Sequence, residues 1–343
     1  MKSASSSPSA TLSGAPKLSS LFDLVCDEMA LVEDWLKSNL IDDNSFVEEL
    51  LKQVFHSGGK RIRPLIVLIS SKATAREVGK VGRLHIILAV LTELIHTASL
   101  VHDDVIDKAS VRRGQETINK RFNDRIAVLM GDLLFAQASI CLARIMNPVI
   151  VGIYGQVLGD LCSGEIKQMR QQFSTTVDWQ AYIDKSISKT ASLFAAGSHS
   201  GAILNGCPNV TIQALKDYGI NLGICFQIVD DLLDITGVQG EIGKAVGSDL
   251  RNGVVTAPAM FVLARNDEAA RQLKKLIDSR AVTSDEGAEE ALAIIKANGG
   301  VDETIALARK YADFSTESLS QLKDSAYKDG LISLCDYVMT RTT

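Results

Sequence analysis

Residues 99–114 read SLVHDDVIDKASVRRG, an apolar stretch that holds three acids in the spacing DDxxD. The same spacing recurs in residues 226–237, FQIVDDLLDITG. The six acids are Asp103, Asp104, Asp107, Asp230, Asp231 and Asp234. Residues four apart lie on one face of a helix, so the first and last acid of each cluster share a face. Like charges at that spacing destabilise a helix by about 0.2–0.5 kcal/mol, so we expect a compensating partner.

Divalent metal ions explain the two acidic clusters better than exposure to solvent does. A solvated acidic stripe at a helix end would explain a single copy equally well. Two copies within apolar segments are harder to explain that way, because an unpaired carboxylate in a low-dielectric interior costs several kcal/mol. Mg²⁺ prefers oxygen ligands and is held by one or two carboxylates together with substrate phosphates. We therefore predict that the clusters face each other and hold Mg²⁺ and a diphosphate between them.

Basic residues near the first cluster fit the same site. Arg112 and Arg113 follow it directly, and residues 58–64 read GGKRIRP. The basic residues of this loop are Lys60, Arg61 and Arg63. Guanidinium groups bind phosphate through paired hydrogen bonds, and lysine supplies a point charge. The loop lacks the spacing of a P-loop and alone would be an ordinary basic turn. Beside two acidic clusters it predicts phosphate binding.

The pattern of apolar residues is helical almost throughout from Leu18 onward, and no long run alternates with a period of two. We therefore expect one all-α domain over residues 18–343. The predicted helices cover residues 18–40, 81–107, 118–146, 149–171, 178–204, 210–235, 256–264, 285–297 and 304–322.

The composition excludes several classes of protein. A net charge of −5 gives no reason to expect nucleic-acid binding. The longest uninterrupted apolar runs, such as PLIVLI and IILAVL, are much shorter than a membrane span, so we expect a soluble chain without one. The six cysteines form no CxxC pair and lie away from the histidines, which indicates reduced thiols and no zinc site.

Residues 1–17, MKSASSSPSATLSGAPK, differ from the rest because they are rich in serine and contain no acid. A disordered tail and the remnant of an organelle transit peptide both explain this composition. The lack of arginine favours a plastid over a mitochondrion. A cytoplasmic location follows if the segment is not a transit remnant.

Several stretches taken together are similar to the trans-isoprenyl diphosphate synthases. They are GGKRIRP, HTASLVHDDVIDKASVRRG, GDLLFAQAS, KTASLFAAG, and FQIVDDLLDITG with GKAVGSDLRNGVVTAP. The resemblance spans the chain from Leu18 to the C-terminus. It implies a helical bundle of the isoprenoid synthase type around a deep central cavity, usually in a homodimer. It also implies condensation of isopentenyl diphosphate with an allylic diphosphate primer, with roughly three Mg²⁺ ions in each active site.

The resemblance assigns roles to individual residues. It implies that Asp103, Asp107 and Asp230 bind Mg²⁺ and that Asp104, Asp231 and Asp234 support them in catalysis. The residues implied to hold isopentenyl diphosphate are Lys60, Arg63, His96 and Arg113. Those implied to contact the allylic diphosphate are Arg112, Lys189, Thr190, Gln227 and Lys244.

Product length is predicted from two positions just before the first cluster. Short-chain members of the family carry aromatic residues four and five places before the first aspartate, where this chain has Ser99 and Ala98. Small residues leave the cavity open below the metals, so the chain resembles long-chain members, particularly the solanesyl type that makes prenylquinone side chains. Peripheral membrane contact could then serve product release.

Other functions remain open at this stage. A geranylgeranyl or shorter-chain synthase would share all of these motifs. A non-catalytic regulatory subunit usually has eroded aspartate motifs, whereas both are intact here. A terpene cyclase typically replaces the second motif with an Asn/Ser/Glu metal motif, which this chain lacks.

Overall fold

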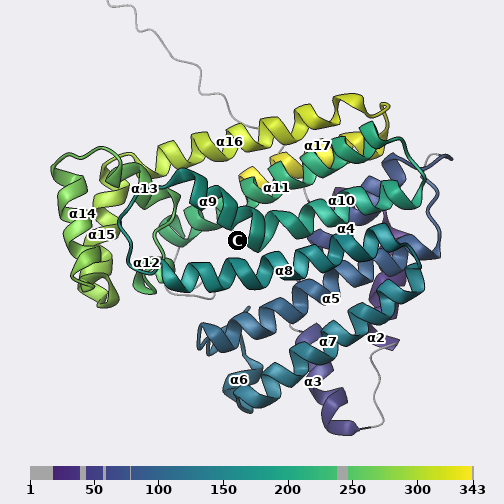
Figure 1. Ribbon diagram of the computed structural model, residues 1–343, viewed down its shortest axis with the longest axis horizontal. Coiled ribbons are helices and arrows are strands. Elements are labelled where there is room, and N and C mark those ends of the chain that lie inside the picture. The colour runs from purple at the N-terminus through teal and green to yellow at the C-terminus, as the bar shows by residue number, and fades with distance from the viewer. Residues whose placement is uncertain (1–17, 39–43, 57–58, 78, 238–245, 342–343) are drawn as a thin grey trace, which may run out of the picture.

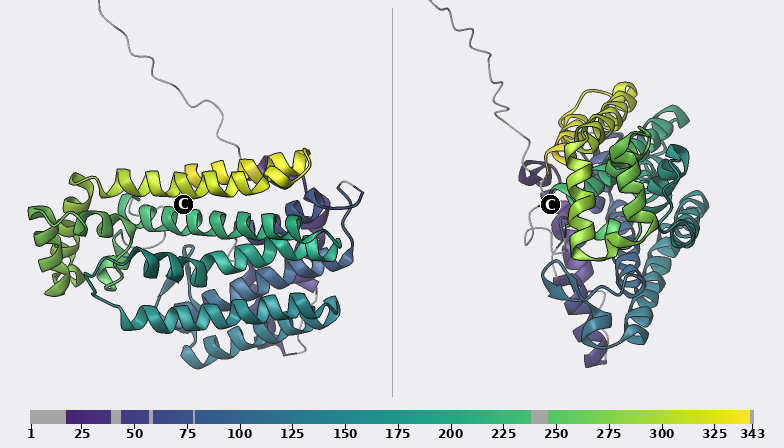
Figure 2. Two further views of the ribbon diagram at one scale, coloured as in Figure 1. Left: turned by 45° about the horizontal axis from the view of Figure 1, so that its top comes forward. Right: turned by 90° about the vertical axis from the view of Figure 1, so that its left-hand side faces the viewer.

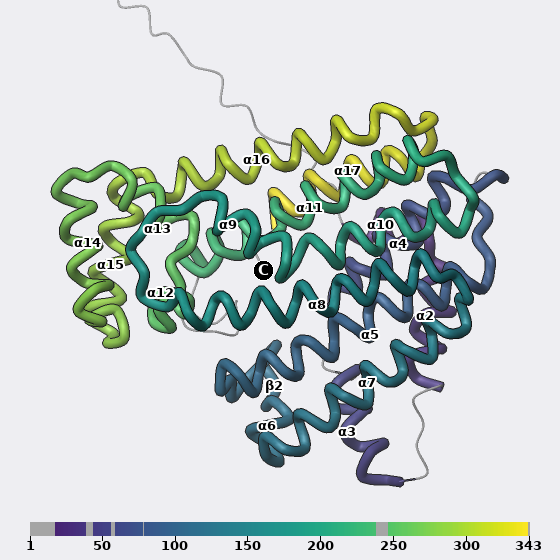
Figure 3. Tube along the Cα trace, in the orientation of Figure 1, coloured from purple at the N-terminus to yellow at the C-terminus, as the bar shows by residue number. Residues whose placement is uncertain are grey.

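The computed structural model describes residues 18–38, 44–56, 59–77, 79–237 and 246–341. Within these ranges the chain is a bundle of helices with one short antiparallel hairpin, so the predicted all-α fold is confirmed (Figure 1). The hairpin joins β1 (Val111–Arg112) to β2 (Gln115–Glu116) and lies beside α6, as Figure 3 shows. The predicted tail, residues 1–17, lies outside the described residues.

The helices of the first half are α1 (Leu18–Asp23), α2 (Cys26–Ser38), α3 (Ser45–His56), α4 (Ile62–Ala73), α5 (Arg83–Ile106), α6 (Ile118–Arg121), α7 (Asp124–Ile145) and α8 (Pro148–Arg170). Those of the second half are α9 (Trp179–Ser186), α10 (Ser192–Leu204), α11 (Asn209–Thr236), α12 (Ser248–Arg251), α13 (Ala257–Leu263), α14 (Glu268–Asp278), α15 (Asp285–Ala297), α16 (Gly300–Ser318) and α17 (Ala326–Thr340). A π-helical turn, Ile187–Ala191, joins α9 to α10, and the 3₁₀ turns are Ala281–Thr283 and Leu319–Gln321.

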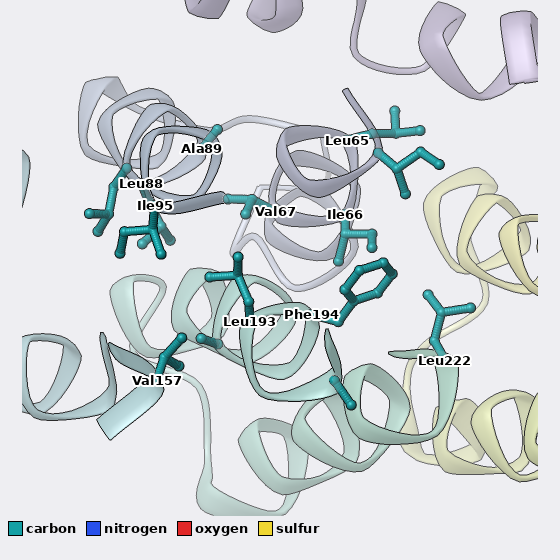
Figure 4. Close-up of a cluster of buried hydrophobic side chains, with 14 of the residues drawn as sticks. Leu65, Ile66, Val67, Leu88, Ala89, Ile95, Val157, Leu193, Phe194 and Leu222 are labelled. Atoms are coloured by element: carbon teal, nitrogen blue, oxygen red, sulfur yellow. The ribbon is translucent and has the colours of Figure 1, made fainter. Parts of the chain in front are cut away.

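The main hydrophobic core lies between α4, α5, α8, α10 and α11 (Figure 4). Helices α10 and α11 pack closely because α11 carries glycine where they meet. A Cβ atom at Gly219 would lie 2.5 Å from the Cα atom of Ala195 in α10, and one at Gly223 would lie 2.4 Å from the Cα atom of Ala191 in the π-helical turn. This close packing brings the C-terminal half of α11, which carries the second aspartate cluster, beside the π-helical turn. The long helices run along the long axis of the molecule (Figure 2), with α14 and α15 at one end around a smaller second core.

Some helices differ from the predicted ranges for identifiable reasons. The predicted helix 178–204 is interrupted by the π-helical turn, and the predicted helix 118–146 is divided by a break that Asn123 caps. Five of the described helices fall outside every predicted range, namely α3, α4, α12, α14 and α17. Helix α4 is buried on nearly all faces, so its apolar residues do not follow the one-sided helical period on which the prediction relied.

Three helices are long and apolar enough to cross a membrane by length and composition, namely α5, α7 and α8. Uninterrupted runs underestimate the length of these apolar segments, because single polar residues break the runs without lowering the average hydropathy much, and the absence of a membrane span stays a prediction. In α5 the apolar window is 78% buried inside the fold, which accounts for its composition. The corresponding windows of α7 and α8 are only 33% and 22% buried.

Candidate active site

A cavity of about 1230 Å³ opens between α5, α8, the π-helical turn and α11 and brings the predicted site residues together. Fourteen predicted residues line it, namely Lys60, Arg63, His96, Ser99, Asp103, Asp107, Arg112, Arg113, Lys189, Thr190, Gln227, Asp230, Asp231 and Asp234. Asp104 and Ala98 do not line it. Lys244 lies outside the described residues.

The first aspartate cluster ends α5 and divides its acids between two tasks. Asp103 and Asp107 line the cavity, and within the described part of the chain their carboxylates form no hydrogen bond or ion pair. Asp104 is 6% exposed and accepts a hydrogen bond from Nε of Arg112 at 2.7 Å. Burial raises the pKa of the Asp103 carboxyl, while the charge of Lys189 opposes that rise. The cluster thus offers two carboxylates to the cavity and uses the third to hold an arginine.

The middle acid of the second cluster is an anchor within α11. Asp231 is 2% exposed and accepts hydrogen bonds from the Tyr182 hydroxyl at 2.7 Å and from Nε2 of Gln227 at 2.8 Å. Thr190 donates to Oε1 of Gln227 at 2.6 Å. These bonds tie α11 to α9 and the π-helical turn. Burial raises the pKa of Asp231, and the two donors act against that rise.

The two outer acids of the second cluster, Asp230 and Asp234, have partners of their own. The side chain of Asp230 is 44% exposed, and Oδ1 accepts a hydrogen bond from Arg341 at 2.7 Å. The guanidinium of Arg341 also stacks on Phe226, with Cζ 3.6 Å from the ring centroid. Asp234 accepts from the backbone N–H and the hydroxyl of Ser248, at 3.1 and 2.8 Å, and so caps α12. Asp230 is therefore the acid of this cluster with the greatest access to the cavity.

The basic side of the cavity collects guanidinium groups around one histidine. Arg63 lies over the ring of Phe194 at 5.0 Å, and burial lowers its pKa to about 10. Burial also lowers the pKa of His96, and Arg63 and Arg113 lower it further. His96 is thus held neutral, and one ring nitrogen can donate a hydrogen bond to an anion. A phosphate placed here would meet both cationic and neutral donors.

The opposite wall carries the predicted allylic residues on the π-helical turn. Lys189 pairs with Glu165 of α8 at 3.2 Å between Nζ and Oε2. Burial acts to lower the pKa of Lys189, but Asp103 and Glu165 outweigh it and the pKa is raised. Lys189 is therefore a permanent cation that faces the first aspartate cluster.

The donor set fits a hard divalent cation bound together with a phosphate ligand. Asp103, Asp107 and Asp230 offer carboxylate oxygens from two sides of one cavity. Within the ranges that the structure describes, no three acidic, histidine or cysteine side chains are grouped closely enough to hold a metal ion by themselves. Mg²⁺ keeps several waters and uses few protein carboxylates, so substrate oxygens would complete its coordination.

The structure also reveals site residues that sequence reasoning missed. They are Glu93, Glu165, Tyr182 and Arg341, and Arg61 had been seen only as part of the basic loop. Glu93 had a visible signal, because it is a lone acid in the apolar run LAVLTELIHT one turn before His96. Arg341 had none, since only the fold brings the end of the chain to Asp230.

Of the two positions predicted to set product length, one lines the cavity and the other does not. Ser99 lines the cavity, and its hydroxyl donates to the carbonyl of His96 at 2.8 Å. Ala98 is fully buried in the core and does not reach the cavity. Apolar side chains also line the cavity, among them Phe135, Leu158 and Leu161.

Known proteins resemble the chain over most of its length. The sequence profile of the polyprenyl synthetase family matches residues 44–295. A protein of Oryza sativa subsp. japonica named solanesyl-diphosphate synthase 2, chloroplastic, is 39% identical over 326 residues, which cover 94% of this chain and 80% of that protein.

Solved structures agree with the sequence comparison. A polyprenyl synthase from Caulobacter crescentus, complexed with calcium and isoprenyl diphosphate, superposes with a TM-score of 0.89 at 29% identity and covers 96% of this chain and 99% of its own. A decaprenyl diphosphate synthase from Rhodobacter capsulatus gives a TM-score of 0.87 at 33% identity and covers 95% of this chain and 100% of its own.

Proposed function

This chain belongs to the polyprenyl synthetase family, and on that premise we propose that it is a long-chain trans-prenyltransferase. It adds isopentenyl diphosphate repeatedly to an allylic diphosphate primer and yields an all-trans polyprenyl diphosphate of about solanesyl length. The observation that carries this proposal is one cavity lined by acids of both DDxxD clusters and by two separate groups of cations.

The residues of the allylic side stabilise the leaving group. Asp103, Asp107 and Asp230 would hold Mg²⁺, roughly three ions in all, which would supply positive charge to the allylic diphosphate. Arg112 and Lys189 add fixed cations at the same wall, so the negative charge that develops as the C–O bond breaks meets charges already in place. The allylic group leaves as a carbocation, and the bonding electrons go to the diphosphate.

The residues of the basic side hold the second substrate. Lys60, Arg63, His96 and Arg113 bind the diphosphate of isopentenyl diphosphate and place its double bond against the carbocation. Attack forms the new C–C bond, and the proton then lost passes to the released diphosphate. The apolar side chains of the lining exclude water that would otherwise quench the cation.

The size of the cavity and its small residue at Ser99 support a long product. A volume of about 1230 Å³ exceeds the roughly 300–1,000 Å³ typical of small-molecule sites. The rice relative is named as a solanesyl-diphosphate synthase, and the Rhodobacter structure as a decaprenyl diphosphate synthase. A shorter product of the geranylgeranyl class is the alternative that product analysis must exclude.

We further propose a homodimer formed through α7 and α8. These helices expose apolar side chains to a degree that is unusual for a monomer, including Leu129 and Ile166 at 63% each. A second copy of the chain would cover this face. A plastid location is supported by the chloroplastic rice relative and by the composition of residues 1–17.

Product sizing tests the proposed function directly. Purified protein is incubated with Mg²⁺, isopentenyl diphosphate and each of the dimethylallyl, geranyl, farnesyl and geranylgeranyl diphosphates, and the products are separated by chain length. Products near nine isoprene units support the proposal (solanesyl length), and a main product of four units or fewer overturns it. No product with any primer would instead indicate a non-catalytic subunit.

A further inference from the structure

Arg61 lies in the basic loop and lines the cavity, but two carboxylates hold its guanidinium. It adopts a left-handed backbone conformation, with φ of 47°, directly before α4. Its Nε donates to Glu33 of α2 at 2.7 Å, and its Nη1 donates to Glu93 of α5 at 2.8 Å. Its side chain is only 11% exposed. Burial acts to lower the pKa of Arg61, but the two carboxylates outweigh it and the pKa is raised.

Glu93 is the buried acid that faces the basic side of the cavity. It lines the cavity one helical turn before His96, and its side chain is 5% exposed. Its charge also acts on Arg63 and Arg113, where it favours the charged guanidinium. Among the described residues, Nε of Arg63 is buried without a hydrogen-bond partner. Glu93 is thus an acid within electrostatic reach of the cations that the proposed function gives to isopentenyl diphosphate.

We propose that Arg61 is a positioning residue that holds the Glu93 carboxylate and keeps it from pairing with Arg63, so that Arg63 stays available to the diphosphate of isopentenyl diphosphate. The inference rests on the proposed function of this cavity. It assigns Arg61 no contact with substrate. Two anchors, Glu93 and Glu33, hold its guanidinium, and the second keeps Arg61 in place beside the first.

The physical reason is that a buried carboxylate must find a cation. Without Arg61, Glu93 would be left with an uncompensated charge, which is costly in a low-dielectric site. Arg63 is a nearby cation with an unused donor, so Glu93 would take it. A diphosphate would then compete with a carboxylate of the protein for the same guanidinium.

The test is a rescue experiment on KM. Arg61→Met keeps an apolar side chain of similar length and removes the charge. We expect it to raise KM for isopentenyl diphosphate about 10- to 100-fold, with KM for the primer changed by less than about threefold. Arg61→Met/Glu93→Gln removes the competing charge as well, and we expect KM for isopentenyl diphosphate to return to within about threefold of wild type.

The matched control is Arg61→Met/Glu33→Gln, which makes the same acid-to-amide change at the other anchor and should keep the full defect. Thermal unfolding of each variant separates loss of fold from loss of binding. Equal KM in Arg61→Met and Arg61→Met/Glu93→Gln would overturn the inference, as would rescue by the Glu33 change. An inactive wild-type protein would refute the proposed function itself, whereas an active wild type without rescue refutes only the role of Arg61.

Discussion

The two DDxxD clusters have the same spacing and different surroundings. At the end of α5, Asp103 and Asp107 face the cavity, and Asp104 holds Arg112. In α11, Asp231 borders the cavity but is almost fully buried, and Asp234 caps α12. The first cluster therefore offers two carboxylates to a metal, and the second offers mainly Asp230.

The two clusters differ most clearly at the middle acid, which is Asp104 in the first and Asp231 in the second. In both clusters it is buried, but in α5 it orients Arg112, a cation that lines the cavity, and in α11 it joins α11 to α9 and the π-helical turn. A spacing motif thus specifies which acids share a helical face, while their partners decide what each acid does. Substitutions at matching positions of the two clusters should therefore have unlike effects.

The largest effect is expected at the cavity-facing acids. Asp103→Ala and Asp230→Ala should each lower kcat at least about 100-fold, because each removes a carboxylate that binds metal and little core volume. Steady-state turnover and thermal unfolding measure the two consequences, and the unfolding midpoint should stay close to wild type. Chelation of divalent ions should abolish turnover reversibly, and full turnover in excess chelator would contradict the metal assignment.

Asp104→Asn should show the positioning role of the first middle acid. Loss of the charged acceptor for Arg112 should raise KM for the allylic primer about 10-fold and leave KM for isopentenyl diphosphate nearly unchanged. The two KM values are measured with the other substrate saturating. A parallel rise in both would mean that Arg112 serves both substrates.

Asp231→Asn should act on stability more than Asp230→Asn does. It weakens two buried hydrogen bonds, so the free energy of unfolding should fall by about 1.5–3 kcal/mol in denaturant titrations. Tyr182→Phe removes one of these bonds without changing charge, and a smaller loss of about 1 kcal/mol is expected. If both Asn variants unfolded at the wild-type denaturant concentration, Asp231 would not be an anchor.

The smallest effect on the first condensation is expected at Ser99. Ser99→Phe places a ring in the cavity below the first cluster, so the main product should shorten to about the farnesyl or geranylgeranyl class while the reaction at the diphosphates continues. Ala98→Tyr should instead strain the core by about 1–3 kcal/mol, because Ala98 is fully buried and does not line the cavity. Chromatography of extracted products decides, and an unchanged long product from Ser99→Phe would show that the chain grows elsewhere.

Much of the fold was predictable because amphipathic helices repeat apolar residues at a fixed period. The uniformly buried α4 escaped this signal, and the π-helical turn has none, since it depends on the packing of α11 against Ala191. Most of the residues that line the cavity could likewise be predicted, because they belong to the sequence motifs.

The division of labour within the site could not be predicted. Which acid faces the cavity depends on partners far away in sequence, such as Tyr182 for Asp231 and Arg341 for Asp230. The Glu93–Arg61 pair likewise forms only when α5 and the loop before α4 meet. Pairings of this kind are set by tertiary structure, and a single sequence does not record them.

The contact between Arg341 and Asp230 has a practical side for anyone who purifies or engineers this protein. Arg341 directly follows α17 and donates a hydrogen bond to Asp230, a carboxylate that lines the cavity. An affinity tag or fusion partner attached there would begin at the rim of the active site.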